Sequence, residues 1–347
     1  MDESPSQDTA AQMAEAARLL SQSVAKVVDE EGAVSAPGTA LFENPFAIED
    51  LLVFDDVTMQ RILSKGSFGL TLEDLAWSMH GAPQTLVKRV RHNLPPEQRK
   101  LFATELRRPL LWEQVEAARR KVLDALFWEL TYWKIPALYE ELTEGEQLHP
   151  GIFRQLEPDL HGKIVLDIGA GSGRASFECI RHGARLVYAV EPSPGLLRIL
   201  KEKLTSEAGG QIIPYSGSFD RLPLEDKSVD MALSCSAFTA RPEQGGEPGL
   251  AELRRVTKPG GKIVLIWPRR EDYVWLIEHG FQYVALSLEQ EMSVRFRSLQ
   301  SALRCAQLFY ARNRAVISYL LERQQPEVPF SLLGFNPPCD YCWLIVK

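Results

Sequence analysis

The amino-acid sequence predicts an α/β domain with a largely parallel sheet, preceded by an all-α domain and an acidic tail. Two observations carry this prediction. Residues 44–127 place apolar residues at helical spacing and contain no strand candidate. Residues 128–347 instead alternate short apolar runs with helical or glycine-bearing stretches. That alternation is typical of a parallel sheet covered by helices.

The overall composition is ordinary for a globular protein, with 45% hydrophobic and 24% charged residues in 347. No apolar run approaches the roughly 18 residues of a membrane span, and the N-terminus lacks the order of a secretory signal. Five cysteines without regular spacing fit reduced thiols, so we expect a cytoplasmic protein. The net charge of −7 argues against binding to nucleic acid.

Charge is unevenly distributed over the first third of the chain. Residues 1–50 hold ten acidic residues against two basic ones, whereas residues 84–121 hold ten basic residues against four glutamates. We expect residues 1–43 to form a mobile acidic tail with one helix near 10–28. The basic stretch is either a solvated helical face or a surface that meets an acidic partner, the tail included.

Five or six short helices are predicted for residues 44–127. Thr71 followed by Asp74 has the pattern of a capping box, which begins a helix. A longer final helix is predicted by apolar residues at helical spacing, namely Val115, Val122, Leu123, Leu126, Phe127 and Leu130.

Seven apolar runs predict the strands of the α/β domain. They are "KIVLDI", "LVYAVEP", "QIIPYSG", "VDMALSC", "GKIVLIWP", "FQYVAL" and "YCWLIVK". Between the last two, residues 287–325 repeat apolar side chains at spacings of three and four. This segment predicts a long amphipathic helical insertion.

The stretch "VLDIGAGSG", residues 165–173, sets three glycines directly after a buried strand. A ligand can lie against a backbone that carries no side chains, and open α/β folds bind ligands at this edge of the sheet. Arg174 stands where a dinucleotide fingerprint needs its third glycine, so NAD is the weaker alternative. Asp167 suits an amino group, and Glu191 at the next strand end suits ribose hydroxyls. A cationic nucleoside without phosphate points to S-adenosylmethionine.

Five blocks of this domain resemble the class I methyltransferases, in particular the type 11 group. In order they are "LYEEL", "VLDIGAGSG", "VEPS", "GSFDRLPLEDKSVDMALS" and "ELRRVTKPGGKIVLIWP". The resemblance implies a Rossmann-like sheet, an enzyme, and S-adenosylmethionine as its cofactor. By position it implies these cofactor-binding residues: Asp167, Gly169, Ala170, Gly171, Gly173, Glu191, Ser218, Phe219 and Ser234. The family usually has an acidic residue where this chain has Ser218.

Methyl transfer from a sulfonium is an in-line displacement, in which alignment of donor and acceptor supplies much of the acceleration. A general base is needed only when the acceptor arrives protonated, and the sequence assigns no catalytic residue. Candidate pocket residues are Trp133, Tyr139, Ser236 and Phe238, with ordinary core packing as the alternative. We expect a small-molecule acceptor. The rival hypothesis is a scaffold that binds the cofactor without turnover.

Residues 44–127 resemble the C-terminal domain of FliG, the bacterial flagellar motor switch protein. The resemblance rests on "IEDLLVFDDVTMQRIL", "LEDLAWSMHGAPQTLVKRVRHNLPPEQRKLF" and "VEAARRKVLD". It implies a bacterial protein with a domain for protein docking. The charged helix that meets the stator in that family keeps Glu105 here but is followed by Arg107 and Arg108. We therefore expect an adaptor or regulatory domain and no motor function.

No metal site is expected. Cys339 and Cys342 form one C-x-x-C without a second pair, and the six histidines are scattered. The motif "NPPC" at 336–339 is predicted to be a turn.

Overall fold

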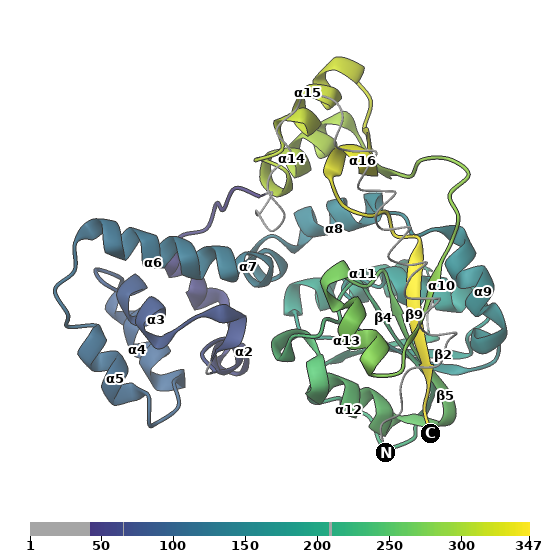
Figure 1. The fold of residues 1–347 in the computed structure, drawn as a ribbon, viewed down its shortest axis with the longest axis horizontal. Coiled ribbons are helices and arrows are strands. Elements are labelled where there is room, and N and C mark those ends of the chain that lie inside the picture. Colours follow the sequence, from purple (N-terminus) through teal and green to yellow (C-terminus); the bar gives the residue numbers. More distant parts are fainter. Residues whose placement is uncertain (1–41, 65, 208–209) are drawn as a thin grey trace.

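The computed structural model describes residues 42–347 except Lys65 and residues 208–209 (Figure 1). The predicted tail, 1–43, lies almost entirely outside the described residues. Phe42, near its end, is buried and stacks on Phe127 with ring centroids 3.6 Å apart. The boundaries drawn at 43/44 and 127/128 stay predictions. In the described part of the chain, no helix is long and apolar enough to cross a membrane.

The helical domain encloses its own apolar core, in which Phe54, Leu86 and Phe102 are fully buried. The capping box is confirmed, because the Asp74 amide donates to Thr71 Oγ1 at 3.1 Å and the Thr71 amide donates to Asp74 Oδ2 at 2.9 Å. Its elements are η1 (Ile48–Val53), α2 (Asp56–Ile62), η2 (Ser67–Gly69), α3 (Leu72–Ser78), α4 (Gln84–Asn93), α5 (Arg99–Glu105) and α6 (Trp112–Ala125).

The predicted longer final helix is confirmed as far as Ala125, but its continuation through Phe127 and Leu130 is wrong. It breaks at Leu126, which has φ −102° and ψ 11°, between α6 and α7 (Phe127–Lys134). The break has a packing reason: Leu126 is buried in the core of the helical domain, whereas Phe127 is buried in a second cluster with the insertion. Helices α7 and α8 (Pro136–Gly145) then lead to the sheet (Figure 1).

All seven predicted strands are confirmed, and they form one sheet in the order β3-β2-β1-β4-β5-β9-β6. The first five are parallel, while β9 pairs antiparallel with both β5 and β6. Their bounds are β1 (Ile164–Ile168), β2 (Leu186–Glu191), β3 (Ile212–Ser216), β4 (Val229–Cys235), β5 (Thr257–Ile266), β6 (Gln282–Ala285) and β9 (Asp340–Ile345). The predicted Rossmann-like α/β fold with an N-terminal helical domain is therefore confirmed.

Helices cover both faces of the sheet. One face packs against α9 (Pro150–Leu160), α10 (Arg174–Arg181) and α11 (Pro194–Glu207). The other packs against α12 (Gly246–Val256) and α13 (Tyr273–Glu278). The short turns η3 (Pro242–Gln244) and η4 (Arg270–Asp272) follow β4 and β5 at the carboxyl edge of the sheet.

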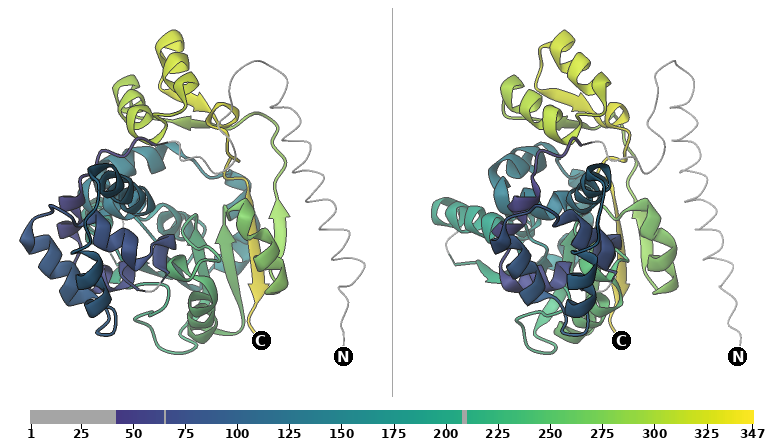
Figure 2. Two further views of the ribbon diagram at one scale, coloured as in Figure 1. Left: turned by 60° about the vertical axis from the view of Figure 1, so that its left-hand side comes forward. Right: turned by 90° about the vertical axis from the view of Figure 1, so that its left-hand side faces the viewer.

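The insertion between β6 and β9 is not the single long helix that the pattern predicts. It contains β7 (Ser293–Arg295), α14 (Leu299–Phe309), α15 (Arg314–Arg323), β8 (Glu327–Pro329) and α16 (Phe330–Leu333). The chain turns at Asn313, whose side-chain amide donates to the Leu332 carbonyl at 2.8 Å. Turning back lets both helices bury their apolar faces in one cluster, which also contains Phe127. Figure 2 shows α14 to α16 standing apart from the sheet.

Candidate functional site

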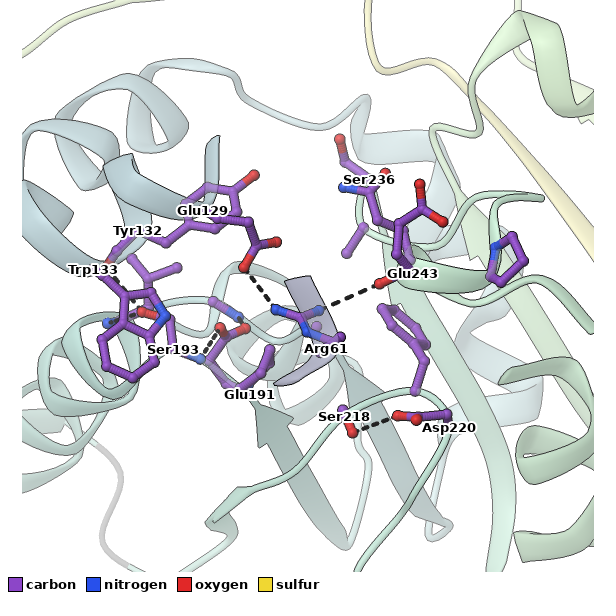
Figure 3. A pocket seen from close by; sticks show the side chains of 18 of the residues that line it. Arg61, Glu129, Tyr132, Trp133, Glu191, Ser193, Ser218, Asp220, Ser236 and Glu243 are labelled. Atoms are coloured by element: carbon purple, nitrogen blue, oxygen red, sulfur yellow. Dashed lines mark hydrogen bonds and ion pairs between the residues drawn. The ribbon is translucent and has the colours of Figure 1, made fainter. Parts of the chain in front are cut away.

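A pocket of about 360 Å³ lies at the carboxyl edge of the sheet, where β1, β2 and β4 end (Figure 3). Its floor includes Gly169 and Gly171 after β1, Glu191 at the end of β2, and Cys235 and Ser236 at the end of β4. Its volume falls within the range of small-molecule sites. The predicted ligand edge and the observed pocket therefore coincide.

Gly169, Gly171 and Gly173 all have a left-handed backbone conformation, with φ of 69°, 57° and 99°, but their surroundings differ. A Cβ at Gly169 would lie 2.5 Å from the Cβ of Ala237, and one at Gly173 would lie 2.6 Å from Leu200 Cδ1. A Cβ at Gly171 would meet nothing within 4 Å. Gly169 and Gly173 are therefore required by packing, while Gly171 leaves open space that a ligand can fill. Ala170 between them is buried.

Glu191 is nearly buried, and both of its carboxylate oxygens accept backbone hydrogen bonds. Oε2 accepts from the Gly171 amide at 2.9 Å and Oε1 from the Ser193 amide at 2.8 Å. Burial raises the pKa of Glu191 to about 7, the backbone donors oppose this shift, and the nearby Glu129 and Asp167 add to it. Each carboxylate oxygen has a second lone pair, so the group can still accept from ligand hydroxyls.

Asp167 is completely buried at the end of β1 and uses only half of its carboxylate. Oδ2 accepts from the Ser176 hydroxyl at 2.6 Å, whereas Oδ1 has no partner within the described structure. Burial raises the pKa of Asp167 to about 6. Ser234 Oγ on β4 is likewise buried without a described partner. Unpaired buried polar atoms are costly, but neither Asp167 nor Ser234 is among the residues that line the pocket.

Ser218 and Phe219 both line the pocket, at the side where the resemblance places the adenine. The Ser218 hydroxyl donates to Asp220 Oδ1 at 2.6 Å. The methyltransferases that the chain resembles usually have an acidic residue at position 218, and here the carboxylate lies two residues later. Phe238, a predicted pocket residue, is not among the lining residues. It is buried behind Phe219, with the two rings edge to face at 5.5 Å.

The opposite wall contains the predicted Trp133 and Tyr139, and also residues that the sequence interpretation missed. Arg61 reaches over from α2 in the helical domain. Its Nη2 lies 2.7 Å from Glu129 Oε2, and its Nη1 donates to the Glu243 carbonyl at 3.3 Å (Figure 3). Arg61 belongs to the first block that resembles FliG, and its partners lie 68 and 182 residues away in the sequence. The sequence therefore indicated Trp133 and Tyr139 on this wall but gave no signal that Arg61, Glu129 and Glu243 meet there.

Nothing in the described part of the chain groups three His, Cys, Asp or Glu side chains as a metal site would. Cys339 and Cys342 are free thiols. The Asn336 carbonyl accepts from Trp267 Nε1 at 3.0 Å, so the motif at 336–339 packs against the end of β5.

Comparison with protein families decides what this domain is. Residues 165–261 match the family model described as a methyltransferase domain. The chain carries a methyltransferase domain. Residues 39–127 match the FliG C-terminal domain, as the sequence blocks predicted.

Curated relatives match the methyltransferase domain over part of their length. A methyltransferase-like protein of Schizosaccharomyces pombe is 34% identical over 115 residues, covering 33% of this chain and 42% of that protein. A methyltransferase of Mycobacterium bovis is 34% identical over 119 residues, covering 33% and 44%. The chain thus spans less than half the length of these relatives. Both are described as uncharacterized.

Solved structures similar to the methyltransferase domain include a SAM-dependent methyltransferase from Methanosarcina mazei. It is 26% identical, with 35% of this chain and 57% of that chain covered and a TM-score of 0.30. The YcgJ protein from Bacillus subtilis is 14% identical, with 56% and 95% covered and a TM-score of 0.39.

Proposed function

We propose that the protein transfers a methyl group from S-adenosylmethionine to an acceptor, which we expect to be a small molecule. The observation that carries this proposal is the open space at Gly171 in the pocket floor, next to the buried carboxylate of Glu191. A carboxylate in the pocket floor favours a ligand with free hydroxyls and a positive charge over a dinucleotide pyrophosphate.

The residues that line the pocket fit this cofactor on the floor and on the adenine side. The bare backbone at Gly171 would lie against its methionine portion, while Asp167 and Ser234, predicted for this end, lie outside the pocket lining. Glu191 would accept from the ribose hydroxyls. Phe219, with Ser218 and Asp220, would border the adenine. When bound, S-adenosylmethionine supplies an activated methyl group on a sulfonium.

The protein's own contribution to the reaction would be alignment of the two reactants. Tyr132 and Tyr139 line the pocket with ring centroids 4.7 Å apart, but burial raises the pKa of both, so they are poor bases near neutral pH. Their rings present electron-rich faces that suit a cation. We therefore assign positioning to these aromatics and propose an acceptor atom that is nucleophilic without help from a base.

Calorimetry with S-adenosylhomocysteine tests the cofactor site directly. We expect saturable binding to the wild type and weaker binding to Gly171→Ala, whose added methyl group enters the open space. No heat with millimolar ligand for either protein would contradict the proposal.

Transfer of a labelled methyl group into fractionated cell extract tests the reaction. Label in the small-molecule fraction supports the expected acceptor, and label in macromolecules corrects it. Binding without any transfer favours the rival hypothesis of a cofactor-sensing scaffold.

We further propose that residues 44–127 dock a protein partner, and we keep the cytoplasm as the expected location. Leu111 and Trp112 at the start of α6 are exposed, 70% and 61%, beside the basic residues Arg107 and Arg108. Cross-linking through a photoreactive residue at position 112, with an exposed position on α12 as control, tests this surface.

A further inference from the structure

The helical domain supplies part of the pocket's lining. Arg61 on α2, Ser64 after it and Ser67 at the start of η2 all line the pocket. The Arg61 side chain is 23% exposed, and the side chain of its partner Glu129 is 9% exposed. An ion pair so enclosed is poorly screened by solvent and has a fixed geometry.

A second bridge joins the same two regions. The Phe68 amide donates to Glu243 Oε1 at 3.2 Å, so the side chain of Glu243 binds η2 while its carbonyl binds Arg61. Phe68 holds a left-handed φ of 54°, which is unfavourable for a residue with a side chain. Glu243 in the η3 turn therefore holds both helical segments: its side chain binds η2, and its backbone carbonyl binds Arg61 on α2.

These bridges lie over the part of the pocket that would hold the nucleoside. Figure 3 shows Arg61 between Glu129 and Glu243, with Glu191 close by. Glu129 also faces Glu191, and two carboxylates repel each other unless a cation lies between or beside them. Arg61 supplies that cation from a different domain.

We propose that the helical domain closes the cofactor pocket through Arg61, a positioning residue that holds Glu129 and the 242–244 turn over Glu191. Cofactor entry and release then require the Arg61 bridges to open. A partner that docks on the helical domain and shifts α2 would change how long the cofactor stays bound. This inference rests on the proposed function for the identity of the ligand.

Hydrogen exchange on the full-length wild-type protein, with and without S-adenosylhomocysteine, separates the two proposals. We expect the ligand to slow exchange in the glycine loop, 169–173, and also in 61–64 and 66–69 of the helical domain. Protection of the glycine loop alone overturns the inference and leaves the proposed function standing. Protection of neither segment overturns both.

Variants test the role of Arg61 itself. We expect Arg61→Ala to speed S-adenosylhomocysteine dissociation about tenfold, as expected for loss of a charged hydrogen bond. We expect Arg61→Lys to restore part of the effect, because it keeps the charge. The matched control is Arg119→Ala, since Arg119 binds the Ser78 and His80 carbonyls at 3.1 and 2.7 Å within the helical domain and does not line the pocket.

The control distinguishes a closing wall from general loosening of the domain. Unchanged dissociation in Arg119→Ala, at an equal loss of thermal stability, supports the inference. Equal acceleration in the two alanine variants overturns it, and so does wild-type dissociation in a folded Arg61→Ala. A double-mutant cycle with Glu129→Gln should show coupling between the two positions.

Discussion

The floor and the outer wall of the pocket are built in different ways. On the floor, the Glu191 carboxylate is held by two backbone amides within 20 residues of it, at 2.9 and 2.8 Å. On the wall, Arg61 is held by Glu129, 68 residues away, and by Glu243, 182 residues away. The floor depends on a local backbone path, whereas the wall depends on how separate regions pack.

The floor and the wall should therefore respond differently to amino-acid substitution. The hydrogen bonds of the floor converge on one side chain, Glu191, which also faces the ligand space, so variants of Glu191 report on ligand binding. The wall is held by side chains, so replacing one of them opens it. Variants of the wall therefore report on how easily the ligand enters and leaves the pocket. The following experiments test this comparison, from the largest expected effect to the smallest.

Replacing Glu191 should cause the largest loss of binding. Glu191→Gln leaves one acceptor oxygen in place of two and removes the charge, so we expect S-adenosylhomocysteine affinity to fall about 100-fold. Calorimetry measures this. Glu202→Gln, an exposed glutamate on α11, is the matched control. Binding within threefold of wild type in Glu191→Gln would refute the ribose role.

Two glycine variants separate packing from binding within the floor. Gly169→Ala adds a collision with Ala237 to its backbone strain, so we expect it to lower the free energy of unfolding by about 3 kcal/mol, against about 1 kcal/mol for Gly171→Ala. Urea unfolding measures both. The reverse order of stability would show that the space at Gly171 is not open.

The raised pKa of Glu191 predicts a pH dependence with opposite signs for binding and for stability. Ionised Glu191 accepts from hydroxyls, so cofactor affinity should rise about tenfold from pH 6 to pH 8, with half the change near pH 7. Calorimetry across this range tests it, and Glu191→Gln should lose the dependence.

The stability of the ligand-free protein should move the other way. A carboxyl whose pKa is higher in the folded than in the unfolded chain binds its proton more tightly in the folded chain. Stability therefore falls as the pH rises from the pKa of the unfolded chain to that of the folded chain. Asp167 and Glu191, with pKa values of about 6 and 7, place this fall between pH 4 and 7. Urea unfolding that is flat or rising over pH 5 to 7 would contradict it.

The smallest effect is expected at Ser218. Its hydroxyl donates to Asp220, and the carboxylate remains in the pocket wall when the hydroxyl is removed. Ser218→Ala should therefore change S-adenosylhomocysteine affinity by about twofold. A loss as large as that of Glu191→Gln would mean that Ser218 binds the ligand directly.

Features that depend on neighbours in the chain were predictable from the sequence. The seven strands, the capping box at Thr71 and the floor residues Gly169, Gly171 and Glu191 each follow from a local pattern. Their positions at one sheet edge follow from the parallel order of the strands. The sequence could therefore predict the fold and half of the pocket.

Features that depend on a choice between two cores were not predictable. A helical pattern runs through Leu126 and Phe127, yet the two side chains enter different apolar clusters and the helix breaks between them. The pattern across residues 287–325 is helical on both sides of Asn313 and does not reveal the turn. The outer wall likewise requires the placement of α2 against η3, which local pattern does not encode.

Strand β9 sits between β5 and β6, and β6 pairs with no other described strand. During synthesis β6 therefore emerges well before the strand that gives it backbone partners, with the whole α14–α16 insertion made in the interval. Completing the sheet requires contacts between residues far apart in sequence, which slows folding. Until then the edge of β5 stays open to pairing with other chains, a hazard for the nascent protein.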